Sequence, residues 1–160
     1  DDILNNRWYY TSKNAQAELS AWLAEQKFSH FVTVTYGKEV RFKKRIKNDL
    51  LHLHNVVHQR AFGSNAKSRK IGNRMLWICV MEMNNTRDGY HVHFLIMSTE
   101  DSPKHSFRGM DVEIREAWCT KLQGTDATQV NIQDLYFSPR VVDYILKTRI
   151  YDHLFFIPEY

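Results

Sequence analysis

The stretch MLWICVMEMNNTRDGYHVHFLIM, residues 75–97, contains two apolar runs separated by a polar segment that is rich in turn-forming residues. The runs at 75–83 and 90–97 have the length and composition of β-strands, and NNTRDG between them is typical of a tight connection. Two such strands pair most economically as an antiparallel hairpin. We therefore expect residues 75–97 to form a β-hairpin within a mainly antiparallel sheet.

The flanking sequence predicts helices and further strands around this hairpin. We expect helices over 13–27 and 41–62, with a strand at 30–36 between them. The inward positions of the two helices are Leu19, Trp22 and Leu23 in the first, and Phe42, Ile46, Leu50, Leu53 and Val57 in the second.

On the C-terminal side, a helix should run from about Asp111 to a cap at Gly124, followed by a strand near 128–136. A last helix should open with Ser138 and Pro139. The predicted fold class is α+β, a mainly antiparallel sheet with helices packed on one face.

Length and composition indicate one domain over residues 1–160, since 160 residues with 43% hydrophobic content suffice for one core. The chain begins without methionine, so its ends could be cuts in a longer protein. No apolar run is long enough to cross a bilayer, and the first thirty residues do not resemble a signal peptide. We expect a cytoplasmic protein with no membrane partner, in which Cys79 and Cys119 are buried, reduced thiols.

The positive charge is clustered, although the net charge is only +4. Residues 41–47 and 67–74 are strongly basic, which suits a phosphate backbone, whereas the alternative is a solvated helix face. The candidate DNA contacts are Arg41, Lys43, Lys44, Lys47, Arg69, Lys70, Arg74 and, in the last predicted helix, Arg140.

A metal site is predicted in the hairpin. His91 and His93 are one residue apart, so in a strand both imidazoles project from the same face. Glu82 interrupts an apolar run, where a charge is costly without a partner, and the hairpin would place it opposite the histidines. Two imidazoles and a carboxylate leave coordination positions open, and the absence of a thiolate favours magnesium or manganese. The alternatives are two surface histidines and a Glu82 that pairs with Arg87 or Arg74.

The last predicted helix, SPRVVDYILKTRIY at 138–151, has two distinct faces. One face carries an apolar stripe and the other carries Arg140, Tyr144, Lys147 and Tyr151. Tyr144 is thus expected to be accessible, with a cation one turn away that can favour the phenolate. The alternative is an amphipathic surface helix without chemistry.

Three motifs in this order form a pattern: HFVTVTY at 30–36, HVH at 91–93 and YILK at 144–147. The chain resembles the HUH endonucleases, and more narrowly the single-tyrosine rolling-circle replication initiator (Rep) proteins. The resemblance spans roughly residues 30–150 and implies an RRM-like sheet of about five strands that carries the histidine pair. It also implies a C-terminal helix that bears the nucleophile.

The resemblance assigns roles to individual residues. It implies that Glu82, His91 and His93 hold a magnesium or manganese ion, that Tyr144 is the nucleophile and that Lys147 is the motif's lysine. The implied activity is nicking and rejoining of single-stranded DNA through a 5′-phosphotyrosine, which initiates rolling-circle replication. The implied partners are single-stranded DNA or an extruded origin hairpin, with a host helicase and replication proteins. Bases could stack on aromatic residues, for which the candidates are Trp8, Tyr9, Tyr10 and Tyr36.

Other readings remain open. A relaxase would use an early tyrosine such as Tyr9 or Tyr10, but generally has a third histidine where this chain has Glu82. A transposase of the IS200/IS605 type typically has a glutamine where this chain has Lys147. A non-catalytic, RRM-like nucleic-acid-binding module is the third alternative, although the aromatic signature of that class is absent.

Overall fold

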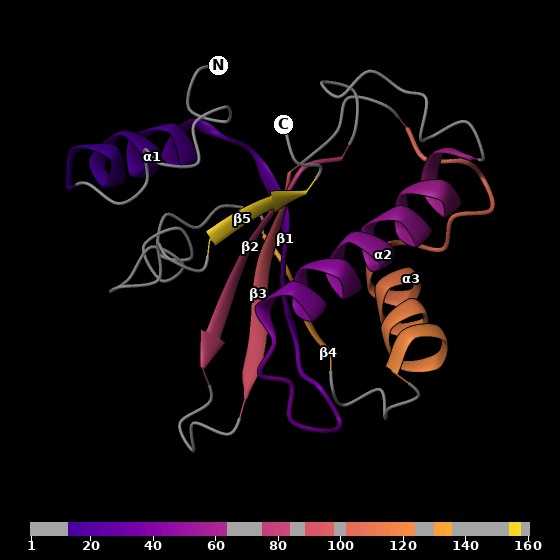
Figure 1. The fold of residues 1–160 in the computed structure, drawn as a ribbon. Coiled ribbons are helices and arrows are strands. Elements are labelled where there is room, and N and C mark those ends of the chain that lie inside the picture. Colours follow the sequence, from indigo (N-terminus) through magenta and orange to yellow (C-terminus); the bar gives the residue numbers. More distant parts are fainter. Residues whose placement is uncertain are drawn as a thin grey trace.

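The computed structural model describes residues 13–63, 75–83, 89–97, 102–123, 130–135 and 154–157. These residues form an α+β fold, in agreement with the predicted class (Figure 1). The helices are α1 (Lys13–Glu25), α2 (Lys43–Phe62) and α3 (Met110–Glu116), which continues into a π-helix (Ala117–Gln123). The strands are β1 (Phe28–Val34), β2 (Trp77–Met83), β3 (Tyr90–Met97), β4 (Val130–Asp134) and β5 (Leu154–Ile157).

The strands form one five-stranded sheet in the order β4-β1-β3-β2-β5. Every neighbouring pair is antiparallel. β2 and β3 pair from Met83 opposite Tyr90 up to Trp77 opposite Ile96, which confirms the predicted hairpin and its register. β3 is consequently the central strand of the sheet.

The larger core lies between the sheet and the helices α2 and α3. Apolar side chains of α2 at the predicted inward positions Ile46, Leu50, Leu53 and Val57 are fully buried there. Alternate residues of the central hairpin meet them, because side chains alternate between the faces of a strand. These residues are Trp77, Cys79 and Met81 of β2 and Val92, Phe94 and Ile96 of β3.

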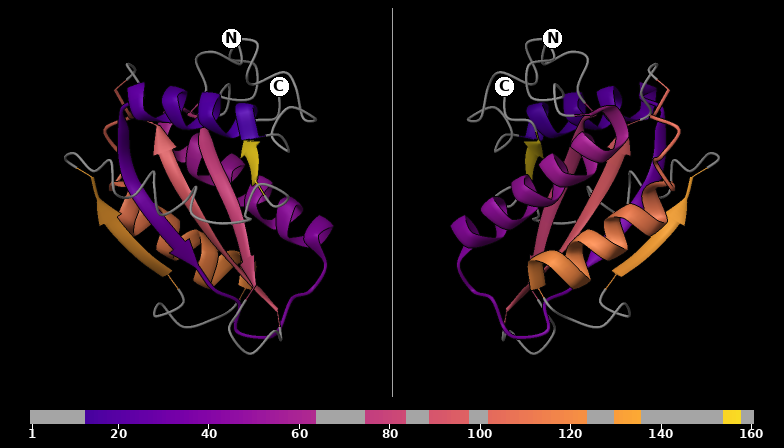
Figure 2. Two further views of the ribbon diagram at one scale, coloured as in Figure 1. Left: turned by 90° about the vertical axis from the view of Figure 1, so that its left-hand side faces the viewer. Right: turned by 90° about the vertical axis from the view of Figure 1, so that its right-hand side faces the viewer.

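A second, smaller core lies on the opposite face under α1. Leu19 and Leu23 are fully buried against Ile78, Leu95 and Phe156. The expectation that the helices pack on one face is therefore wrong, because α1 crosses the other face (Figure 2). The run WICVM is apolar at every position because its section of β2 is covered on both sides.

Two further details differ from the prediction. Phe42 is 77% exposed and not part of the core. The helix begins one residue later, and Phe42 is its N-cap with extended backbone angles of −91° and 108°. β5 was not expected, and its four residues pair with β2 at the edge of the sheet.

Cys79 and Cys119 are buried thiols that form no disulfide with each other, as predicted, and burial raises the pKa of Cys79. The predicted cap at Gly124 and the predicted helix at 138–151 lie outside the described residues. Among the helices that the structure describes, none combines the length and the apolar character that crossing a membrane requires.

Candidate metal centre

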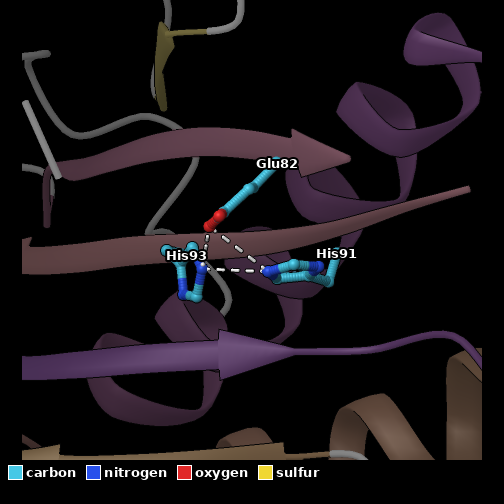
Figure 3. Close-up of side chains that lie close together, drawn as sticks. All are labelled: Glu82, His91 and His93. Carbon is cyan, nitrogen blue, oxygen red and sulfur yellow. Dashed lines mark hydrogen bonds and ion pairs between the residues drawn. The ribbon is translucent and has the colours of Figure 1, made fainter. Parts of the chain in front are cut away.

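Glu82, His91 and His93 come together on one face of the sheet (Figure 3). This face also carries α1, because Val80 and Leu95, two residues from Glu82 and His93, pack with Leu19 and Leu23 of that helix. A carboxylate oxygen of Glu82 lies 2.7 Å from His93 Nε2 and 3.4 Å from His91 Nε2. The two Nε2 atoms are 3.1 Å apart. The predicted opposition of Glu82 and the histidine pair is confirmed, since Glu82 and His91 are direct cross-strand partners.

The larger core determines which way these side chains point. Val92 and Phe94 are fully buried on the α2 side, so the alternation of β3 directs His91 and His93 to the α1 side. A slip of one residue would move both histidines into the core and the apolar residues out of it. The packing of one face therefore maintains the geometry of the site on the other.

The cluster is accessible at one side and buried at the other. The Glu82 side chain is 40% exposed and that of His91 is 21% exposed, whereas that of His93 is 10% exposed. Burial of the ring lowers the pKa of His93, and the neighbouring His91 lowers it further, while Glu82 acts in the opposite direction. His93 is consequently held in the neutral form, which is the form that binds a metal.

β1 contributes two contacts to His93 that the sequence did not reveal. Thr33, the cross-strand partner of His93, places its hydroxyl oxygen 2.8 Å from Nδ1. The Phe31 ring stacks on the imidazole with centroids 5.6 Å apart and an interplanar angle of 15°. Both residues belong to the predicted strand at 30–36, and their spacing of two was a signal that they share a face.

The arrangement fits a divalent ion. Adjacent ligands of a six-coordinate ion, each about 2.1 Å from it, are about 3 Å apart. The three observed separations, 2.7, 3.1 and 3.4 Å, are close to that value. When Nε2 of His93 donates its lone pair to a metal, the ring proton is on Nδ1, where the Thr33 oxygen can accept it. The cluster could therefore hold a metal ion.

The other candidate residues, predicted to bind DNA or to act in catalysis, do not gather at this cluster within the described part of the chain. Arg41, Lys43 and Lys44 are exposed near the start of α2, whereas Lys47 is half-buried with its Nζ 5.6 Å from the centre of the Phe155 ring. α2 lies on the face opposite the cluster, so the structure does not gather these cations around it. The remaining candidates, Tyr144, Lys147, Arg69, Lys70, Arg74 and Arg140, lie outside the described residues.

Two further predictions concern an ion pair of Glu82 and the stacking role of Tyr36. Arg87 and Arg74, the proposed ion-pair partners of Glu82, lie outside the described residues, and its described partners are the two histidines. Tyr36, a candidate for base stacking, instead faces inward. Its hydroxyl donates to Asp49 at 2.9 Å and its ring contacts Trp118 edge-on. Burial, reinforced by Asp49, raises the pKa of Tyr36 far above its ordinary value.

Comparison with known proteins gives no relative for this chain. No family model, no curated protein and no solved structure matches it. The case for a function consequently depends on the geometry of the metal centre and on the motifs of the sequence.

Proposed function

We propose that this chain is a metal-dependent nicking enzyme for single-stranded DNA, of the HUH type. The observation that carries the proposal is the convergence of Glu82, His91 and His93 on one face of the central hairpin. The motifs at 30–36, 91–93 and 144–147 support it by their order. The antiparallel sheet with the histidines on its central strand agrees with the RRM-like arrangement that this class implies.

Manganese or magnesium is the proposed ion. The three protein ligands fill only part of an octahedral shell, so positions remain for phosphate oxygens. Carboxylate and water suit magnesium, whereas two imidazoles shift the preference toward manganese. A bound ion would polarise the scissile phosphate and offset the charge that develops on its oxygens.

Tyr144 is the proposed nucleophile. Its hydroxyl oxygen forms a bond to phosphorus as the bond from phosphorus to the 3′-oxygen breaks. The tyrosine proton is lost to solvent, and the departing 3′-oxygen takes up a proton from solvent. The products are a 5′-phosphotyrosine and a free 3′-hydroxyl, which can reverse the step. Lys147, one turn later in the predicted helix, would stabilise negative charge on the attacking or phosphoryl oxygens.

Formation of a covalent protein–DNA adduct tests the proposal. The protein is incubated with labelled single-stranded origin-type oligonucleotides and manganese, and adducts are resolved by denaturing electrophoresis. We expect a manganese-dependent adduct that disappears in Tyr144→Phe. Tyr151→Phe, on the same predicted helical face, is the matched control and should keep the adduct.

Peptide mapping of the adduct separates the alternatives. Attachment at Tyr9 or Tyr10 would indicate a relaxase-like arrangement and would refute Tyr144 as nucleophile. Oligonucleotide binding without any adduct, across a panel of sequences and both metals, would favour the non-catalytic binding module.

A further inference from the structure

Phe42 is the most exposed large apolar side chain of the described residues. Its exposed fraction is 77%, whereas Leu51, Met83 and Val112 are 43–45% exposed. A phenylalanine ring in water forgoes the free energy that burial would bring. The chain nevertheless holds this ring outward at the N-cap of α2, where its extended backbone turns it away from the core.

Cationic residues flank Phe42 in the sequence. Arg41, Lys43 and Lys44 are all exposed, and we call these three residues together with Phe42 the Phe42 patch. The first turn of α2 contains no acidic residue. Glu39 forms an ion pair with Arg41 at 3.2 Å, and Lys43 and Lys44 give the patch its excess of positive charge.

The patch is anchored at the end of the sheet that carries the metal centre. The Tyr90 amide, one residue before His91, donates to the Val40 carbonyl at 3.0 Å. Val40 is only 3% exposed. Gly89 permits this close approach, because a Cβ there would lie 3.0 Å from the Val40 nitrogen and 3.2 Å from its oxygen. The loop from β1 to α2 reaches the end of the sheet where β2 ends and β3 begins (Figure 1).

Charge complementarity and the aromatic ring together define the partner. Lysine and arginine attract a phosphate backbone, and a freely accessible ring offers a stacking surface to an unpaired base. Bases in a duplex are already stacked on both sides, so a duplex could use the cations but not the ring. The inward-facing Tyr36 cannot supply this surface, because its ring packs on Trp118.

We propose that the Phe42 patch, at the end of the sheet where β3 begins, binds single-stranded nucleic acid, with Phe42 stacking on a base and Lys43 and Lys44 contacting the backbone. This inference rests on the proposed function, which explains why a single strand of DNA would be present. It adds a determinant of substrate binding that is separate from the metal ligands.

Binding of a fluorescein-labelled, mixed-sequence oligonucleotide tests the patch. Anisotropy is measured in EDTA, which prevents cleavage, with the single strand and with the same strand annealed to its complement. Phe42→Ala should weaken single-strand binding roughly 10-fold, the scale of one lost stacking contact, and leave duplex binding within about twofold. Leu51→Ala, another exposed apolar residue of α2, is the matched control and should bind normally.

Conservative variants distinguish stacking from apolar contact. Phe42→Tyr should bind like the wild type, whereas Phe42→Leu should be as weak as Phe42→Ala. Lys44→Gln should instead make the salt dependence shallower, by about 0.7 in the logarithmic slope for one lost phosphate contact. Thermal melting should show that all these variants fold, since the altered side chains are exposed.

Several results would overturn the inference. They are unchanged single-strand binding in Phe42→Ala, full binding in Phe42→Leu, and a wild type that does not bind the oligonucleotide. A wild-type dimer that Phe42→Ala dissociates in sedimentation, with DNA affinity unaffected, would assign the patch to a second copy. Adduct formation is measured separately. An adduct that forms equally well in Phe42→Ala would exclude the role of the patch but leave the nicking function in place. Binding that depends on Phe42, without any adduct, would exclude the nicking function but leave the patch.

Discussion

On the α2 side of the sheet, alternate residues of β2 and β3 enter one continuous apolar core. On the α1 side the apolar packing ends near Val80 and Leu95, and the next positions toward the turn are His93, His91 and Glu82. The same two strands thus supply packing on one face and potential ligands on the other. Because every second residue belongs to the core, the register that buries Phe94 is also the register that aligns the histidines.

The two faces also treat carboxylates differently. Glu113 of α3 is 3% exposed and forms ion pairs with Arg60 at 2.7 Å and Arg108 at 2.8 Å. Glu82 is 40% exposed and its described partners are two imidazoles. Arginine is always protonated and neutralises its acid, whereas an imidazole binds a metal in its neutral form, so the carboxylate charge in such a cluster is left for the cation. Glu113 therefore has the environment of a structural ion pair, and Glu82 has that of the proposed metal ligand.

The largest effect should come from the α2 side of the sheet. Phe94 is fully buried and stacks on Trp77 with ring centroids 4.5 Å apart. Phe94→Ala should lower the free energy of unfolding by about 3–5 kcal/mol, because it removes a large buried ring and leaves a cavity. Urea denaturation measures this change. A loss below about 1 kcal/mol would show that packing on this face does not dominate the stability of the protein.

The next largest effect should appear on the α1 side of the sheet, at the metal centre. His93→Ala should weaken manganese binding on the order of 100-fold in calorimetric titration, because one of the three proposed ligands is lost. Added manganese should raise the melting temperature of the wild type but not that of the variant. His52→Ala, at an exposed position of α2, is the matched control. Equal affinity in His93→Ala would refute the metal centre.

Much of this site could be predicted because the hairpin is local. Two apolar runs and a polar turn identify the strands, and the pairing of Met83 with Tyr90 across that turn then fixes Glu82 opposite His91. The side-chain alternation of a strand adds that His91 and His93 point the same way. None of these steps requires knowledge of distant contacts.

Long-range choices were less accessible from sequence. The amphipathic pattern of α1 predicts a buried face through Leu19 and Leu23 but not which side of the sheet receives it, since β2 is apolar on both sides. β5 has only four residues, which are too few for the sequence pattern to predict a strand. Periodicity also cannot locate a helix start to one residue, which is why Phe42 was assigned to the core.

The buried carboxylate on the α2 side of the sheet, Glu113, should have an intermediate effect on stability. Glu113→Gln should lower the free energy of unfolding by about 2 kcal/mol at neutral pH, because its three charge-assisted hydrogen bonds from Arg60 and Arg108 weaken. Hydrogen bonds from Arg108 first, and then from Arg60, lower the pKa of Glu113 from 4.5 to about 2. The stabilisation is therefore complete above about pH 4.5 and is lost as the pH falls toward 2.

Denaturation of wild type and Glu113→Gln across that pH range measures this dependence. The difference in unfolding free energy between them should shrink as the pH falls from about 5 to about 2. Glu116→Gln is the comparison variant, since Glu116 also pairs with Arg60 and Arg108 but is 37% exposed, and it should matter less. A pH-independent difference would show that Glu113 does not contribute through its charge.

The smallest effect should come from Thr33, which acts on the metal centre only through His93. Its hydroxyl, 2.8 Å from Nδ1, can accept the ring proton and so keep the Nε2 lone pair directed at the ion. Thr33→Val has nearly the same shape but lacks the acceptor, and should bind manganese roughly 10-fold more weakly, while Thr33→Ser should recover most of the affinity. Nitrogen chemical shifts of the His93 ring should show the Nδ1-protonated tautomer losing population in Thr33→Val but not in Thr33→Ser. A purely structural role would change the melting temperature without changing the tautomer, and wild-type affinity in Thr33→Val would show that Phe31 and Glu82 orient His93 without it.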